Sequence, residues 1–88
     1  MQIIWDPEKN KKLNAERGIA LAELAIIILE RRYLAVLKNP ARPGQRIFVL
    51  SYHGYTQAVP FVFDSERNIV LKTAFPSRKC HKIYGGKK

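Results

Sequence analysis

The chain has 88 residues, 47% of them hydrophobic, which is enough for one folded domain (residues 1–88) and too little for a second core. Sixteen Lys and Arg against seven Asp and Glu give a net charge of +9. The excess is concentrated late in the chain, because residues 69–88 hold six basic residues and no acidic one. Such a charge points to nucleic acid, an acidic membrane or an acidic protein, with solubility as the plain alternative, and we favour nucleic acid.

The sequence also indicates the cellular compartment in which the protein is expected. The longest apolar stretch, residues 19–29, is broken by Glu23 and falls short of the roughly 18 residues that span a bilayer. The first residues lack a basic segment followed by an apolar run, so no signal peptide is expected. A single cysteine, Cys80, cannot form an internal disulfide. We therefore expect a cytoplasmic protein that does not bind membranes.

The first third of the chain predicts a short strand and two helices. Residues 2–5 are an apolar run that suits a strand, and Asp6 followed by proline is typical of a helix start. The first helix is expected over residues 7–16, ending at Gly18. Apolar residues at helical spacing predict a second helix over residues 21–32, with a stripe wide enough to be buried on more than one side or covered by a partner.

The remainder predicts strands. Alternating side chains mark strands at residues 33–37, 45–52, 55–63 and 69–75, with a tight turn at His53-Gly54. Pro60 has no N–H to donate, so the third of these strands should have an edge or a bulge there. A last short helix or turn begins at Pro76-Ser77 and ends near Gly85-Gly86. The predicted fold class is α+β: an antiparallel sheet of four to five strands, with two N-terminal helices packed on one face and a short C-terminal helix.

No established metal or cofactor motif is present. His53, Cys80 and His81 do not form a tetrahedral ligand set, and adjacent Cys80-His81 is poor chelate spacing. Gly85-Gly86 is not a phosphate-binding loop, and none of the serines lies in a nucleophile motif. We therefore expect no metal, no cofactor and no small-molecule ligand.

Basic and aromatic residues interleave in the second half of the chain. Cations contact phosphates and aromatic rings stack on unpaired bases, and RNA cleavage by the 2′-OH needs only a base, cations and an acid. Surface solvation or core packing is the alternative for each candidate. The candidates for the chemistry are Arg78, Lys72, His81, Glu16 and Tyr84, and those for RNA binding are Lys79, Arg46, Arg17, Lys82 and Tyr52.

The order of these segments resembles the BrnT-type toxins. The resemblance starts with Trp5-Asp6-Pro7-Glu8-Lys9 and Arg17-Gly18-Ile19, where the family has a strand end, a helix and a His-Gly or Arg-Gly pair. It continues through Arg46-Ile47-Phe48-Val49 and Val59-Pro60-Phe61-Val62 to Leu71-Lys72-Thr73 and Pro76-Ser77-Arg78-Lys79. The resemblance extends over nearly the whole chain and rests on the order and spacing of these segments.

The resemblance implies a RelE-like fold and a metal-independent endoribonuclease that halts growth. It also implies a cognate antitoxin, acidic and of the ribbon-helix-helix type. The family's basic residue on the last strand falls on Lys72, and its closing Ser-Ala-Arg motif falls on Pro76-Ser77-Arg78, so Arg78 is the foremost site residue. Arg17 stands where many members have His, and Cys80-His81 where Ala-Thr is common, so the acid and base stay open.

Two other classes remain open on the residues alone. One is a non-catalytic RNA- or DNA-binding module, which would bind nucleic acid in a salt-sensitive way and leave it intact. The other is a structural protein that binds an acidic partner and ignores nucleic acid.

Overall fold

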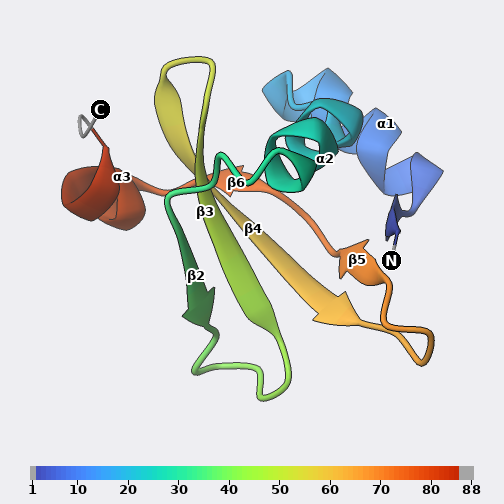
Figure 1. The fold of residues 1–88 in the computed structure, drawn as a ribbon. Coiled ribbons are helices and arrows are strands. Elements are labelled where there is room, and N and C mark those ends of the chain that lie inside the picture. Colours follow the sequence, from blue (N-terminus) through green and yellow to red (C-terminus); the bar gives the residue numbers. More distant parts are fainter. Residues whose placement is uncertain (1, 86–88) are drawn as a thin grey trace.

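The computed structural model describes residues 2–85 and has one mixed sheet with helices on both sides (Figure 1). The sheet order is β1-β5-β4-β3-β2, and β6 pairs with β4. The strands are β1 (Ile3–Trp5), β2 (Ala35–Lys38), β3 (Arg46–Tyr52), β4 (Tyr55–Phe63), β5 (Ile69–Leu71) and β6 (Phe75–Pro76), and the helices are α1 (Pro7–Arg17), α2 (Leu21–Leu29) and α3 (Arg78–Tyr84). The predicted α+β class is confirmed, as are its two N-terminal helices and its short C-terminal helix.

The helix ends follow local chemistry. The Asp6 carboxylate accepts the Glu8 N–H at 2.9 Å and begins α1, and Gly18 ends it in the left-handed region at φ 65°. The second helix is shorter than predicted, because it ends at Leu29 and not at residue 32. Arg31 has φ 56°, a left-handed conformation that cannot continue a helix, so the chain turns there toward β2.

One strand pair departs from the antiparallel expectation. β1 lies parallel to β5, with Ile3 beside Ile69, whereas the other pairs of the sheet are antiparallel. β1 runs in the same direction as β5, the strand that follows the turn after β4. A parallel pair needs a long connection, which α1, α2 and the strands between them supply.

The strand predicted over residues 69–75 is interrupted. Leu71 pairs with Phe61 and Phe75 pairs with Ala58, so three residues of one strand lie opposite two of β4. The extra residue is a bulge, and Pro60 lies opposite it with only its carbonyl bonded, to the Lys72 N–H at 2.9 Å. The irregularity thus lies opposite Pro60, but the extra residue belongs to the segment from β5 to β6 and not to β4, where the bulge was predicted.

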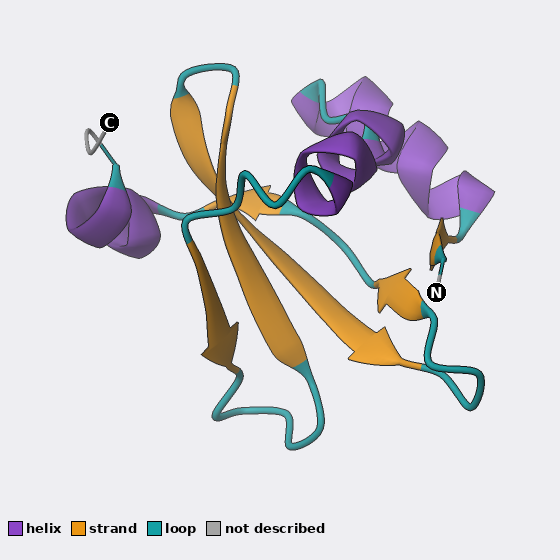
Figure 2. Cartoon of the chain, in the orientation of Figure 1, coloured by secondary structure: helices purple, strands orange, loops and turns teal. Residues whose placement is uncertain are grey.

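The core lies between the sheet and the first two helices. Figure 2 shows α1 and α2 together on one side of the strands and α3 on the other. Leu24 of α2 and Leu50 of β3 are fully buried there. The other members of this core are Leu13, Ile19, Leu21, Ile28, Phe48, Tyr52, Val59, Phe61, Ile69, Leu71 and Ala74, with Ile3, Trp5, Ile27 and Tyr33 packed against it. One face of the sheet is therefore covered by α1 and α2.

Tyr52 belongs to this core, and its predicted role in RNA binding is wrong. The residue is only 6% exposed, so its ring is not free to stack on a base. Its hydroxyl donates to the Glu23 carboxylate and accepts the Ala20 N–H at 3.3 Å. Tyr52 thereby ties the start of α2 to the sheet.

We expect Tyr52→Phe to lower the free energy of unfolding by about 1–3 kcal/mol at pH 7, because Ala20 N–H and Glu23 each lose a partner. Burial, and then the hydrogen bond to Glu23, raise the pKa of the Tyr52 hydroxyl above its ordinary value of 10.0. The stabilisation that the Tyr52 hydroxyl provides is fully present below pH 10 and is lost as the pH rises through the folded-state pKa.

Urea unfolding of the wild type and Tyr52→Phe between pH 7 and 11 checks this expectation. The difference between them should shrink above pH 10. Tyr33→Phe is the matched control, since Tyr33 packs on Phe48 by its ring, and it should stay within about 0.5 kcal/mol of the wild type. A Tyr52→Phe difference that is independent of pH would count against the raised pKa.

Candidate nucleic-acid interface

The C-terminal helix is the most basic element of the fold. Ser77 begins α3, because its hydroxyl accepts the Cys80 N–H at 3.1 Å. Three cations of this helix are exposed: Arg78, Lys79 and Lys82. Residues three and four apart share a helix face, so Arg78 lies on the same side as His81 and Lys82. The helix thus combines three exposed cations with one imidazole.

The His81 ring is held in one orientation by the start of β4. Its Nδ1 lies 2.9 Å from the Thr56 hydroxyl oxygen, and its plane stacks on Tyr55 with ring centroids 4.1 Å apart and 16° between planes. Thr56 is 1% exposed, so the hydroxyl is a fixed partner. Nε2 is the ring nitrogen that this bond does not use. A histidine fixed in this way can pass a proton to or from a bound group.

Gly85 closes over this histidine at the end of α3. Its N–H donates to the His81 carbonyl at 2.7 Å. A Cβ at this position would lie 2.3 Å from Nδ1 of His81 and 2.4 Å from its carbonyl oxygen. The close approach therefore requires glycine. The predicted helix end near Gly85 is confirmed, and Gly86 lies outside the described residues.

We expect Gly85→Ala to push the His81 ring off Thr56 while the core stays intact. A shift of about 1 Å at a reacting group can reduce a rate roughly 10²-fold, so any reaction that uses His81 should slow on this scale. NMR would detect the change as a moved His81 side-chain signal with unchanged signals from Phe48 and Leu50. Retention of the His81 signal and of the Thr56 contact in the variant would contradict this account of Gly85.

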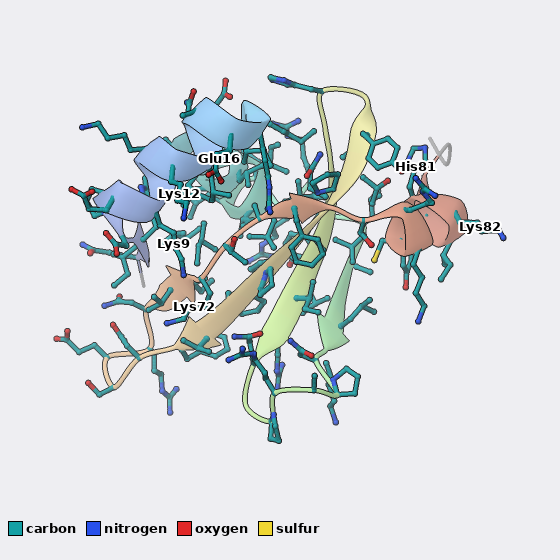
Figure 3. The ribbon with its side chains drawn as sticks, turned by 180° about the vertical axis from the view of Figure 1, so that it is seen from behind. Lys9, Lys12, Glu16, Lys72, His81 and Lys82 are labelled. Carbon is teal, nitrogen blue, oxygen red and sulfur yellow. The ribbon has the colours of Figure 1, made fainter. Side chains whose placement is uncertain are left out.

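A second group of candidates surrounds Lys72. Figure 3 shows Lys9, Lys12 and Glu16 along one side of α1, with Lys72 close to Lys9. The spacing of three and seven residues puts these α1 side chains on one helix face. Lys9 and Lys72 line the same groove. Glu16 is the one acidic candidate in this group.

The five residues predicted for the chemistry lie in two separate places in the structure. Figure 3 places Glu16 and Lys72 on the α1 side of the molecule and His81 on the α3 side. Glu16 therefore lies apart from His81, and the predicted chemical residues fall into two groups. Arg78 and Tyr84 remain with His81, because all three lie on α3. Their short spacing in the sequence makes them neighbours on one helix, whereas Glu16 lies far from them along the chain.

The other residues predicted to bind RNA are scattered. Arg17 is bound to the sheet, since its Nη1 donates to the Ala74 carbonyl at 2.8 Å. That bond locks the end of α1 to the segment between β5 and β6. Arg46 is exposed at the start of β3, where it pairs in register with Lys38 and lines a hollow of the β2–β3 loop.

Several residues of the interface were missed from the sequence. Thr56 is 25 residues from His81 and carried no signal, because only the fold brings α3 onto β4. Tyr55, which stacks on His81, is not among the residues predicted for the site. Lys9, Arg42 and Phe75 line one groove with Lys72. The basic character of Lys9 was visible in the sequence, but its neighbours were not.

The described part of the chain lacks two kinds of feature. Within residues 2–85 no helix is long and apolar enough to cross a membrane. The same residues contain no group of three or more His, Cys, Asp or Glu side chains placed to hold a metal ion.

Comparison with solved structures places the chain in a fold class already known among ribonuclease toxins. The similar structure is the crystal structure of the ribonuclease toxin BrnT of Brucella abortus, with a TM-score of 0.66. The two sequences are 20% identical, and the match covers 88% of this chain and 96% of that one. No family model matches the sequence, and comparison with curated proteins gives no match. The BrnT-type fold expected from the order of the segments is confirmed.

Proposed function

We propose that this chain is the ribonuclease toxin of a type II toxin–antitoxin pair, which cleaves RNA in the cytoplasm without a metal ion and arrests growth. The observation that carries the proposal is the likeness to the BrnT ribonuclease toxin, which extends over 88% of this chain and 96% of the other. The net charge of +9 supports an RNA substrate.

The chemistry is assigned to α3. The 2′-hydroxyl oxygen of RNA attacks the adjacent phosphorus, the bond to the 5′-oxygen breaks, and the products are a cyclic phosphate and a 5′-hydroxyl. Arg78 binds the phosphate and offsets its growing charge, helped by Lys79 and Lys82. His81 and Tyr84, three residues apart on the helix, are the groups for the two proton transfers: one takes the 2′-hydroxyl proton and the other supplies a proton to the leaving oxygen.

The partner is proposed to be an acidic antitoxin of the ribbon-helix-helix type. Its charge would complement the +9 of this chain and could mask the RNA-binding surface. The exposed apolar side of α2 is offered as part of the contact, since Ile26 is 52% and Leu29 is 65% exposed. A neighbouring gene for a short acidic protein with this pattern would support the pairing.

A second candidate is a non-catalytic RNA- or DNA-binding module. The same exposed cations on α3 favour it, because phosphate binding alone requires no proton transfer. It predicts salt-sensitive binding of nucleic acid that stays intact.

Controlled expression in a bacterial host separates the two candidates. Wild-type chain and Arg78→Ala are induced side by side, growth is followed, and RNA integrity is read on a gel. The toxin proposal predicts arrest and degraded RNA for the wild type, and neither for a folded Arg78→Ala variant. Full toxicity of folded Arg78→Ala would remove Arg78 from the site, and harmless wild type with intact RNA would favour the binding module.

A further inference from the structure

A groove of about 420 Å³ opens on the sheet at a distance from His81. It brings together side chains from α1, from the loop between β2 and β3, and from the strands. Its lining includes three cations and three apolar side chains but no carboxylate. The cations are Lys9, Arg42 and Lys72, and the apolar residues are Ile47, Pro60 and Phe75. Asn39, Gln45 and Thr73 complete the lining.

This combination fits a nucleotide better than a simple anion. Cations bind phosphates, and the half-buried ring of Phe75 offers a face on which a base can stack. The Asn39 amide nitrogen donates to the Gln45 amide oxygen at 2.7 Å, which fixes both amides. The Asn39 amide oxygen also accepts the Ala41 N–H at 3.1 Å, so the group left to meet a base edge is chiefly the Gln45 amide nitrogen. An acidic peptide would use the cations but would have no use for the aromatic face.

The groove lies along the same strand as the His81 contact. Pro60 in the groove and Thr56 under His81 are both on β4, four residues apart. Because side chains alternate along a strand, the two share one face of the sheet, and the rise per residue puts them about 13 Å apart. A single nucleic-acid strand that leaves the groove along β4 therefore arrives at α3.

We infer that the groove binds a nucleotide of a single-stranded RNA substrate, a short distance from the cleaved bond. Its base stacks on Phe75, and Lys9, Arg42 and Lys72 bind the flanking phosphates. The inference rests on the proposed function, in that RNA is the ligand. It gives Lys72 a role in binding, which its separation from His81 requires.

Binding of an oligonucleotide that cannot be cleaved tests the groove without relying on catalysis. The probe is a fluorescein-labelled single-stranded 2′-O-methyl RNA, which has no free 2′-hydroxyl to attack, and fluorescence anisotropy gives its Kd. Phe75→Leu keeps an apolar side chain and removes the aromatic face, so we expect Kd to rise roughly 5- to 150-fold. Phe75→Tyr retains the ring and should bind within about twofold of the wild type.

The cations are tested by a matched pair on α1. Lys9 lines the groove, whereas Lys11 lies on the same helix and lines other hollows. Both changes to alanine remove one charge from the chain. Lys9→Ala should lower the slope of log Kd against log salt by about 1, and Lys11→Ala should leave it unchanged.

The outcomes separate this inference from the proposed function. If Phe75→Leu binds the probe as the wild type does, or if Lys9→Ala and Lys11→Ala weaken binding equally, the groove is not the nucleotide site, even if the chain cleaves RNA. If polyglutamate displaces the probe and binds Phe75→Leu and the wild type equally, the groove is a general polyanion surface and the inference is wrong. Selective loss in Phe75→Leu supports the groove even in a chain that cuts no RNA.

Discussion

His81→Ala is expected to lower the rate of RNA cleavage by about 10²–10⁴-fold with little change in RNA affinity. A positioned acid or base contributes on this scale, and His81 is positioned by Thr56 at 2.9 Å and by the Tyr55 ring. The loss should fall on kcat and not on KM, because the phosphate-binding cations of α3 remain. Cleavage of a short RNA by purified variants, with KM and kcat determined separately, measures it.

His53→Ala is the matched control for this prediction. His53 is the other histidine of the chain, exposed in the turn between β3 and β4, where it stacks on Tyr52. Its loss should leave the cleavage rate within about twofold, on the scale of an exposed side chain without a substrate contact. Equal rates for His81→Ala and the wild type would remove His81 from the chemistry and leave Tyr84 and Arg78 as the remaining groups.

Leu24→Ala is expected to lower the free energy of unfolding by about 2–5 kcal/mol. Leu24 is 0% exposed, at the middle of α2, and it packs in the core between this helix and the sheet. Removing the side chain costs the lost burial and leaves a cavity in a small core, which has little stability to spare. Urea or thermal unfolding followed by circular dichroism provides the measurement.

Leu29→Ala provides the comparison on the same helix. Leu29 is 65% exposed, so its replacement should change the unfolding free energy by about 0.5 kcal/mol or less. A large loss for Leu29→Ala with a small one for Leu24→Ala would mean that α2 presents the opposite face to the sheet.

Much of the fold could be predicted from local chemistry. Asp6 and Gly18 mark the ends of α1 because capping and left-handed φ are local properties. The hairpin at His53-Gly54 follows from alternation on both sides of a two-residue turn, with His53 at φ 50° and Gly54 at φ 78°. Pro60 marked the level of the sheet at which pairing is irregular, although the extra residue is in the strand beside it.

The errors concern contacts between distant segments. Nothing local to residues 2–5 says that β1 lies parallel to β5, because this pairing depends on the path of the chain between them. Tyr52 alternates with Phe48 and Leu50 on one face of its strand, and the packing of α2 onto β3 buries that face. Glu16 and His81 were grouped by chemical type, and the fold places them on different sides of the molecule.

The candidate site was predictable where its residues share one short helix. Arg78, His81 and Tyr84 are separated by three residues each, a spacing that any helix converts into proximity. Thr56 and the groove around Lys72 could not be found in this way, because their members come from elements far apart in the sequence.

The most direct test of the central claim is incubation of purified wild-type chain with single-stranded RNA in the presence of EDTA, followed by identification of the product ends. The proposed mechanism predicts fragments that carry a cyclic phosphate at one end and a 5′-hydroxyl at the other, with Arg78→Ala and His81→Ala giving far slower cleavage. Intact RNA under these conditions, bound in a salt-dependent way by a folded chain, would contradict the ribonuclease assignment and leave a nucleic-acid-binding module.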